Sequence, residues 1–192
     1  MKSIHKLVLT AIMSALCYVA FTFIQIKIPT PAGYTSFHLG NAFCVLAALL
    51  IDGVSGGIAG AIGMGIGDLL DPAYVITAPK TIFLKFFIGF ITGTIAHKVF
   101  HIKELNGKQL FKATVISCLC GMAFNMLGEP LISYLYYNLI LNNSSKALSY
   151  LTAAKFITTA VNGILSIIIA SLLYISSSKR LNRFIENYDG KK

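Results

Sequence analysis

The sequence predicts an all-α integral membrane protein that forms a single domain. Of its 192 residues, 56% have hydrophobic side chains and only 12% are charged, and the mean hydropathy is +0.74. A soluble protein with this many apolar residues would need more charged residues to cover its core with a polar surface. The small charged fraction therefore indicates that lipid surrounds much of the chain. We therefore treat residues 1–192 as one membrane domain.

Six apolar segments, separated by charged or turn-forming residues, predict six transmembrane helices. A bilayer core about 30 Å thick requires roughly 20 helical residues. The first break, at residues 27–33, contains two prolines and a glycine, which is typical of a turn. The expected spans are residues 7–26, 37–51, 56–70, 80–100, 112–137 and 150–175.

The distribution of lysine and arginine predicts that both chain ends are cytoplasmic. Positive residues collect in cytoplasmic loops, and most of the 16 lysines and arginines fall near the two ends or within residues 98–112. The expected outer loops are residues 27–36, 71–79 and 139–148. Because the basic residues flank apolar runs and form no stripe with aromatic residues, we expect no nucleic-acid partner.

Glycines recur four residues apart in the third and fourth expected helices. Small residues at this spacing let two helix backbones approach closely, so they predict tight helix packing. The glycines of the third helix do not form a nucleotide-binding fingerprint, because Leu70 stands in place of the last glycine, and no Walker sequence occurs in the chain. The pairs are Gly56 and Gly60, Gly63 and Gly67, and Gly89 and Gly93.

Charged residues inside the expected helices predict the functional site. A charge at the bilayer centre costs at least about 2.5 kcal/mol, which singles out Lys85, Glu129 and Lys155. Helical spacing places each of them on a polar stripe, at a shared depth within about 10 to 15 Å of the outer helix ends. These stripes predict an outward-opening cavity for a small polar molecule, although mutual neutralisation of Glu129 and either lysine would also explain the charges.

The candidate binding residues lie on these stripes or at the outer end of the second helix. Pro130, directly after Glu129, is expected to break the fifth helix and to free backbone carbonyl groups for a ligand. The candidates are His38, Asn41, Lys85, Asn125, Glu129, Tyr136, Lys155 and Asn162.

The sequence predicts no catalytic centre, metal site or cofactor. Its four cysteines lie in apolar segments without metal-ligand spacing, and its four histidines do not form an intramembrane pair. Two other classes remain open: a stand-alone channel or secondary carrier, which would usually show an internal repeat, and a membrane enzyme that uses Glu129.

The first half of the chain resembles the S components of energy-coupling factor (ECF) vitamin transporters. It is similar in particular to the branch that includes pyridoxine, hydroxymethylpyrimidine and pantothenate carriers. The similar region covers about residues 7–96, and the second half matches in helix count and hydropathy. The motifs are Phe37-His38-Leu39-Gly40-Asn41, Asp52-Gly-Val-Ser-Gly-Gly57, Ala61-Ile-Gly-Met-Gly-Ile-Gly-Asp68-Leu-Leu70, Ala78-Pro-Lys-Thr-Ile82 and Lys85-Phe-Phe-Ile-Gly89.

This resemblance implies a multi-pass protein of the bacterial cell membrane that captures a small water-soluble vitamin at the outer face. Its implied partners are a transmembrane coupling subunit and two cytoplasmic ATPases. Ala11 and Ala15, four residues apart on the first helix, correspond to the alanine pair by which S components contact the coupling subunit. The vitamin stays open: Tyr136, Asn125 and Glu129 suit a neutral aromatic ring, whereas Lys85 or Lys155 would pair with the carboxylate of pantothenate.

Overall fold

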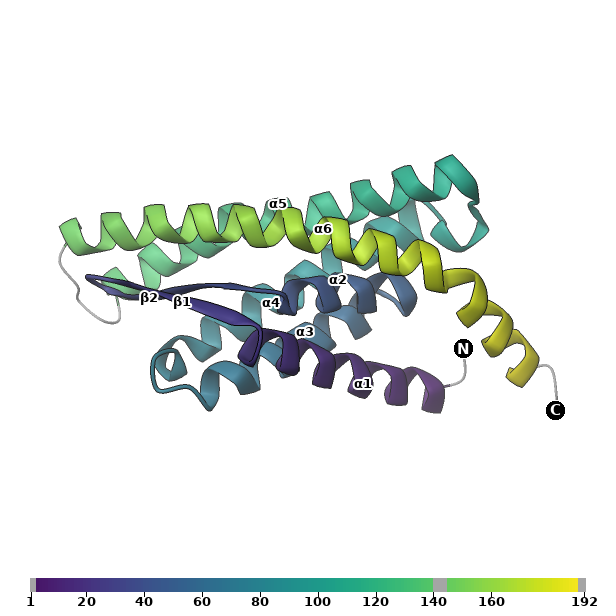
Figure 1. Ribbon diagram of the computed structural model, residues 1–192, viewed down its shortest axis with the longest axis horizontal. Coiled ribbons are helices and arrows are strands. Elements are labelled where there is room, and N and C mark those ends of the chain that lie inside the picture. Colours follow the sequence, from purple (N-terminus) through teal and green to yellow (C-terminus); the bar gives the residue numbers. More distant parts are fainter. Residues whose placement is uncertain (1–2, 140–144, 190–192) are drawn as a thin grey trace.

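The computed structural model describes residues 3–139 and 145–189, which fold into a helical bundle with one β-hairpin. The helices run along a common long axis (Figure 1). Short helical turns at Val75–Thr77, Ile95–Val99 and Ile102–Glu104 link α3 to α4 and α4 to α5. The six α-helices are α1 (Ser3–Thr22), α2 (Gly40–Leu50), α3 (Gly53–Leu69), α4 (Ala78–Thr94), α5 (Gly107–Leu139) and α6 (Ser145–Asp189).

The chain between α1 and α2 forms an antiparallel hairpin of β1 (Gln25–Thr30) and β2 (Gly33–His38). The expectation of an all-α chain is wrong here, as is the expected extension of the first helix to residue 26. Pro29 and Pro31 cannot donate helical hydrogen bonds. Gly33 has φ +146°, a conformation that residues with a side chain rarely adopt and that permits the tight turn.

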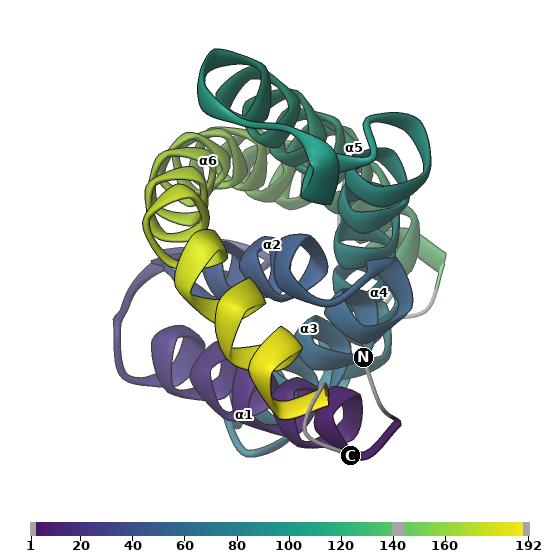
Figure 2. The ribbon, with the colours of Figure 1, turned by 90° about the vertical axis from the view of Figure 1, so that its right-hand side faces the viewer.

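Four helical segments are long and apolar enough to cross a membrane by length and composition: Ser3–Thr22, Val75–Val99, Gly107–Leu139 and Lys146–Ser177. The remaining two expected spans correspond to α2 and α3, which have 11 and 17 residues and extend about 17 and 26 Å. Nearly all of α2 is buried, and it lies enclosed between α6 and α3 when the bundle is viewed end-on (Figure 2). The count of six spans stays a prediction.

Glycines bring α3 into close contact with its neighbours, which confirms the packing predicted from their spacing. A Cβ atom on Gly89 of α4 would lie 2.3 Å from the backbone of Gly56 in α3, and one on Gly93 would lie 2.3 Å from that of Gly53. On another side of α3, a Cβ atom on Gly63 would meet an α1 carbonyl oxygen at 2.3 Å. Real Cβ atoms do not approach this closely, so these positions require glycine.

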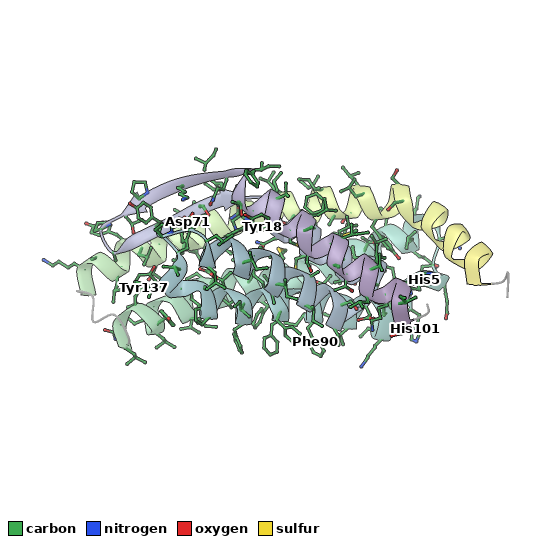
Figure 3. All side chains as sticks on the ribbon, turned by 90° about the horizontal axis from the view of Figure 1, so that it is seen from below. His5, Tyr18, Asp71, Phe90, His101 and Tyr137 are labelled. Atoms are coloured by element: carbon green, nitrogen blue, oxygen red, sulfur yellow. The ribbon has the colours of Figure 1, made fainter. Side chains whose placement is uncertain are left out.

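The two ends of the bundle carry different features. His5 and His101 lie at one end, and Asp71 and Tyr137 lie at the other (Figure 3). The start of α1 and the end of α6 share the first end (Figure 1). That both chain ends are cytoplasmic stays a prediction. The hairpin tip and the connection between α3 and α4 lie at the second end (Figure 1).

An ion pair joins two helices at the end that carries His5. Lys6 Nζ of α1 lies 2.6 Å from Asp52 Oδ2, and Asp52 caps α3 by accepting a hydrogen bond from the Ser55 amide at 2.9 Å. Burial would raise the pKa of Asp52, but the hydrogen bonds and charge supplied by Lys6 and Ser55 hold it below its usual value. Asp52 thus anchors the start of α3 against α1.

We expect Gly89→Ala to lower the free energy of unfolding by about 1 to 3 kcal/mol, because the added methyl group would overpack the α3–α4 contact. Thermal unfolding of the purified protein in detergent measures the change. Gly163→Ala is the matched control, since a Cβ atom there meets its nearest neighbour at an ordinary 3.6 Å, and alanine favours the helix. Equal stabilities of the two variants would contradict the tight contact.

Candidate functional site

A buried polar cavity of about 50 Å³ lies where β2 meets the helices. Each of the six α-helices contributes to its wall, and among these described lining residues only Phe21 lacks a polar side-chain atom. The cavity therefore suits a polar ligand. The lining residues are Phe21, Thr35, Ser36, His38, Asn41, Asp68, Tyr74, Thr77, Lys80, Thr81, Lys85, Asn125, Glu129, Lys155, Thr158, Thr159 and Asn162.

A buried charge cluster centred on Glu129 joins α4, α5 and α6. Glu129 Oε1 accepts hydrogen bonds from Lys80 Nζ at 2.6 Å and Lys155 Nζ at 2.9 Å, and a third from Ser133 Oγ at 3.2 Å. The side chains of Lys80 and Lys155 are 2% and 7% exposed, so both ammonium groups depend on this carboxylate for neutralisation.

Lys80 is a member of the cluster that sequence reasoning missed. It was placed at the flank of an expected span that starts at residue 80, but α4 begins at Ala78, which sets Lys80 inside the first turn. A charge next to a helix start is common at membrane surfaces. The Lys80 side chain points into the cavity because of how α4 packs against its neighbours, and hydropathy carries no information about this packing.

Lys85 lies in the same cavity but outside the Glu129 ion pairs. It is 5% exposed, and among the described residues its ammonium donates one long hydrogen bond, to Asn125 Oδ1 at 3.4 Å. The backbone carbonyl of Lys85 accepts from Cys44 Sγ of α2 at 3.5 Å, which fixes this turn of α4 against α2. Lys85 is therefore a buried cation without an ion-pair partner in the described chain.

Asn162 and Thr158 of α6 hold β2 against the bundle. Asn162 Oδ1 accepts from the His38 amide at 3.1 Å, and its Nδ2 donates to the Ser36 carbonyl at 3.0 Å. The hydroxyls of Thr158 and Thr35 share a hydrogen bond at 2.7 Å. Asn162 was proposed from sequence as a ligand contact, and the structure shows that its amide already binds the hairpin backbone.

The hairpin is also tied to the connection between α3 and α4. Lys27 of β1 forms an ion pair with Asp71, and its ammonium lies 5.6 Å from the centre of the Tyr74 ring. Burial raises the pKa of Tyr74 to about 12. These contacts attach the hairpin to the connection that supplies Tyr74 to the cavity wall.

Two predicted features differ from the structure. Tyr136 does not line the cavity, because its hydroxyl donates to the Ile76 carbonyl at 2.6 Å and ties α5 to the turn before α4. The expected break at Pro130 is wrong, since α5 continues through it to Leu139. Proline is accommodated there because neighbouring helices pack around the site.

Polar atoms without a partner remain in the cavity wall. Within the described chain, His38 Nδ1 and both side-chain amide atoms of Asn41 are buried and make no hydrogen bond. The His38 ring packs edge-on against Phe21 with centroids 4.7 Å apart. Buried polar groups are rarely left unpaired, so these atoms mark places that a ligand can satisfy.

Asp68 is a second residue that sequence reasoning did not place in the site. It is 3% exposed and lines the cavity near the end of α3. The criterion that singled out Glu129, a charge inside an apolar segment, also applies to Asp68. Among the described residues, no group of three or more histidine, cysteine, aspartate or glutamate side chains is placed to hold a metal ion.

Fold and site together define a helical protein with segments able to span a membrane and a polar cavity lined by buried side chains. The chain belongs to the family described as ECF-type riboflavin transporter, S component, which matches residues 1–179. This confirms the resemblance to S components, and the substrate-binding subunit of an ECF transporter is the role that the family defines. The more specific branch stays a prediction.

Two solved structures share the fold. A structure of ThiT from Listeria monocytogenes has a TM-score of 0.66 and 19% sequence identity, covering 94% of this chain and 98% of that chain. The S component of a bacterial ECF transporter has a TM-score of 0.60 and 19% identity, covering 96% and 99% of the two chains. At this identity they establish a common fold alone. No curated protein sequence matches the chain.

We expect Glu129→Gln to lower the free energy of unfolding by about 3 to 5 kcal/mol, because it leaves two buried ammonium groups without a counter-charge. Thermal unfolding in detergent measures the effect. Glu104→Gln is the matched control, since Glu104 is exposed and lies outside the cavity lining. Similar unfolding temperatures for both variants would contradict the role assigned to the cluster.

Proposed function

We propose that this chain captures a small water-soluble vitamin, or a vitamin precursor, at the outer face of the bacterial cell membrane for an ATP-driven ECF importer. Pyridoxine, hydroxymethylpyrimidine and pantothenate are the substrates that we favour. The buried polar cavity beneath the hairpin, in a chain of the S-component family, carries this proposal.

The cavity lining supports a substrate smaller and more polar than riboflavin, after which the family is named. A three-ring system gains most of its binding energy from apolar and aromatic faces. The described wall instead presents hydroxyl, amide, ammonium and carboxylate groups, with Phe21 as its one fully apolar side chain. Such a wall suits a single small ring or a short polar chain that carries hydroxyl groups.

Substrate entry requires the cavity walls to separate. All of its lining residues except Glu129 are buried, so a ligand reaches them only when the wall opens. We assign the movement to the hairpin, because hydrogen bonds from Asn162 and Thr158 and the Lys27–Asp71 ion pair attach it. Such polar contacts exchange with water more readily than a packed apolar interface does.

The energy source lies in partner subunits. The chain has no Walker sequence, so we assign ATP hydrolysis to two cytoplasmic ATPases that act through a transmembrane coupling subunit. Ala11 and Ala15 are both exposed on α1, within a face whose large side chains are also exposed. This small-residue strip is open to a partner helix.

Of the rival functions, a stand-alone carrier predicts uptake by this chain without ATP or partners, and an enzyme predicts turnover of the bound molecule. No contact in the described chain favours either one. Glu129, the acid that an enzyme would use, already accepts hydrogen bonds from two lysines through one oxygen.

We expect one vitamin to raise the thermal stability of the purified chain in a screen of B vitamins and their precursors. A ligand at 100 times its dissociation constant adds about 2.7 kcal/mol. The screen measures unfolding temperature in detergent, with riboflavin included. A folded protein that no vitamin stabilises would contradict vitamin capture.

We expect Ala11→Trp and Ala15→Trp to abolish vitamin uptake in cells that contain the whole transporter, while leaving binding to the purified chain unchanged. The indole ring would block the close approach of a partner helix. Ala123→Trp is the matched control, because Ala123 is an exposed small residue on α5. Normal uptake by the α1 variants would exclude this strip as the coupling surface.

A further inference from the structure

We infer, on the basis of the proposed function, that the substrate carries an anionic oxygen and that Lys85, Asn41 and His38 form the subsite that binds it. Among the favoured substrates, pantothenate has a carboxylate and pyridoxine has an ionisable phenol. Hydroxymethylpyrimidine has no anionic oxygen, so the subsite disfavours it.

The net charge of the cavity wall favours a negatively charged ligand. Three lysines and two carboxylates line the cavity, which gives one positive charge in excess when all five are ionised. Protonation of either acid would enlarge this excess. Because uncompensated charge is costly in a buried site, an anion that enters the cavity restores the balance.

Lys85 is the lysine of the cavity wall that forms no ion pair within the described chain. Glu129 forms ion pairs with Lys80 and Lys155 at 2.6 and 2.9 Å. Within the described chain, the hydrogen bond of the Lys85 ammonium goes to the neutral Asn125 oxygen, at 3.4 Å, and the charges of Glu129 and Asp68 act on Lys85 without an ion pair. An ammonium group has three N–H donors. Lys85 therefore has the charge and two unused donors to bind an oxyanion.

Asn41 supplies further donors to the cavity that Lys85 lines. Cys44, which contacts the Lys85 backbone at 3.5 Å, follows Asn41 by three residues on the same face of α2. Asn41 is 1% exposed, lines the cavity and has no partner for its amide within the described chain. A side-chain amide beside an ammonium group is a suitable pair of donors for a carboxylate or phenolate.

His38 completes the group of unpaired atoms. Its Nδ1 is buried without a partner in the described chain, and its ring is held in place by Phe21 and by the Asn162 bond to its own amide. The tautomer that carries hydrogen on Nδ1 donates to an oxyanion. Three side chains of one cavity wall thus have unused donors, while Asn162, Glu129 and Lys155 are engaged with other protein groups.

Calorimetric titration of the purified full chain in detergent tests the subsite with chemically matched pairs. Pantothenate is compared with pantothenol, which has a hydroxymethyl group in place of the carboxylate, and pyridoxine with its 3-O-methyl ether. Riboflavin and hydroxymethylpyrimidine serve as ligands without an anionic oxygen. We expect one anionic ligand to bind, and its neutral counterpart to bind at least about tenfold more weakly.

Lys85→Met should lower the affinity for the anionic ligand by roughly ten- to a hundredfold, and it should remove the preference for that ligand over its neutral counterpart. Lys112→Met, which changes an exposed lysine of α5, should retain the affinity for the anionic ligand and the preference over its neutral counterpart. Asn41→Leu gives a second, independent test. It removes an unpaired buried amide, so the empty protein should unfold at the same or a higher temperature while the anionic ligand binds more weakly.

The outcomes separate this inference from the proposed function. Equal binding of an anionic ligand and its neutral counterpart, or a preference that survives Lys85→Met, would overturn the anion subsite. Tight binding of hydroxymethylpyrimidine or riboflavin that is unchanged in both variants would overturn it as well, and would leave vitamin capture intact. Binding of no vitamin by the folded chain would contradict the proposed function itself.

Discussion

The carboxylate of Glu129 is the interaction on which the site depends. One of its oxygens accepts hydrogen bonds from lysines on two other helices, so α4, α5 and α6 meet at a single atom. The penalty for burying three charges is recovered only when the geometry holds all of them together. The cluster therefore fixes the spacing of these helices where they enclose the cavity, and it lets Lys80 and Lys155 remain in a nearly dry site without a ligand.

The extent of the cavity follows from the second constraint, the glycines. On one stripe of α4, Gly89 and Gly93 bring the helix into backbone contact with α3. One turn earlier on this stripe stands Lys85, which lines the cavity. Helices that touch through glycine leave no room between them, whereas longer polar side chains hold them apart. The same stripe thus packs tightly against α3 at Gly89 and Gly93 and presents the Lys85 side chain to the cavity.

Much of this architecture is contained in local sequence, because hydropathy and small-residue spacing act over one helix at a time. They predicted the helices and the glycine contacts, and they selected Lys85, Glu129 and Lys155, which the structure places in one cavity. The hairpin was missed because its prolines indicate a turn, although polar and apolar residues alternate along Gln25 to Ile28. Pairing between Lys80 and Glu129 spans 49 positions, and only tertiary packing decides it.

Residues with the same chemistry consequently have different roles. Asn162 and Asn41 are both buried asparagines of the cavity wall, yet Asn162 is fully engaged with β2 and Asn41 has no partner within the described chain. A paired amide stabilises the empty protein, whereas an unpaired one lowers its stability until something binds. In a site that contains both kinds of amide, closure of the hairpin is coupled to binding of the ligand. The paired groups hold the hairpin against the bundle. The unpaired groups make this closed state most stable when a ligand supplies their missing hydrogen bonds.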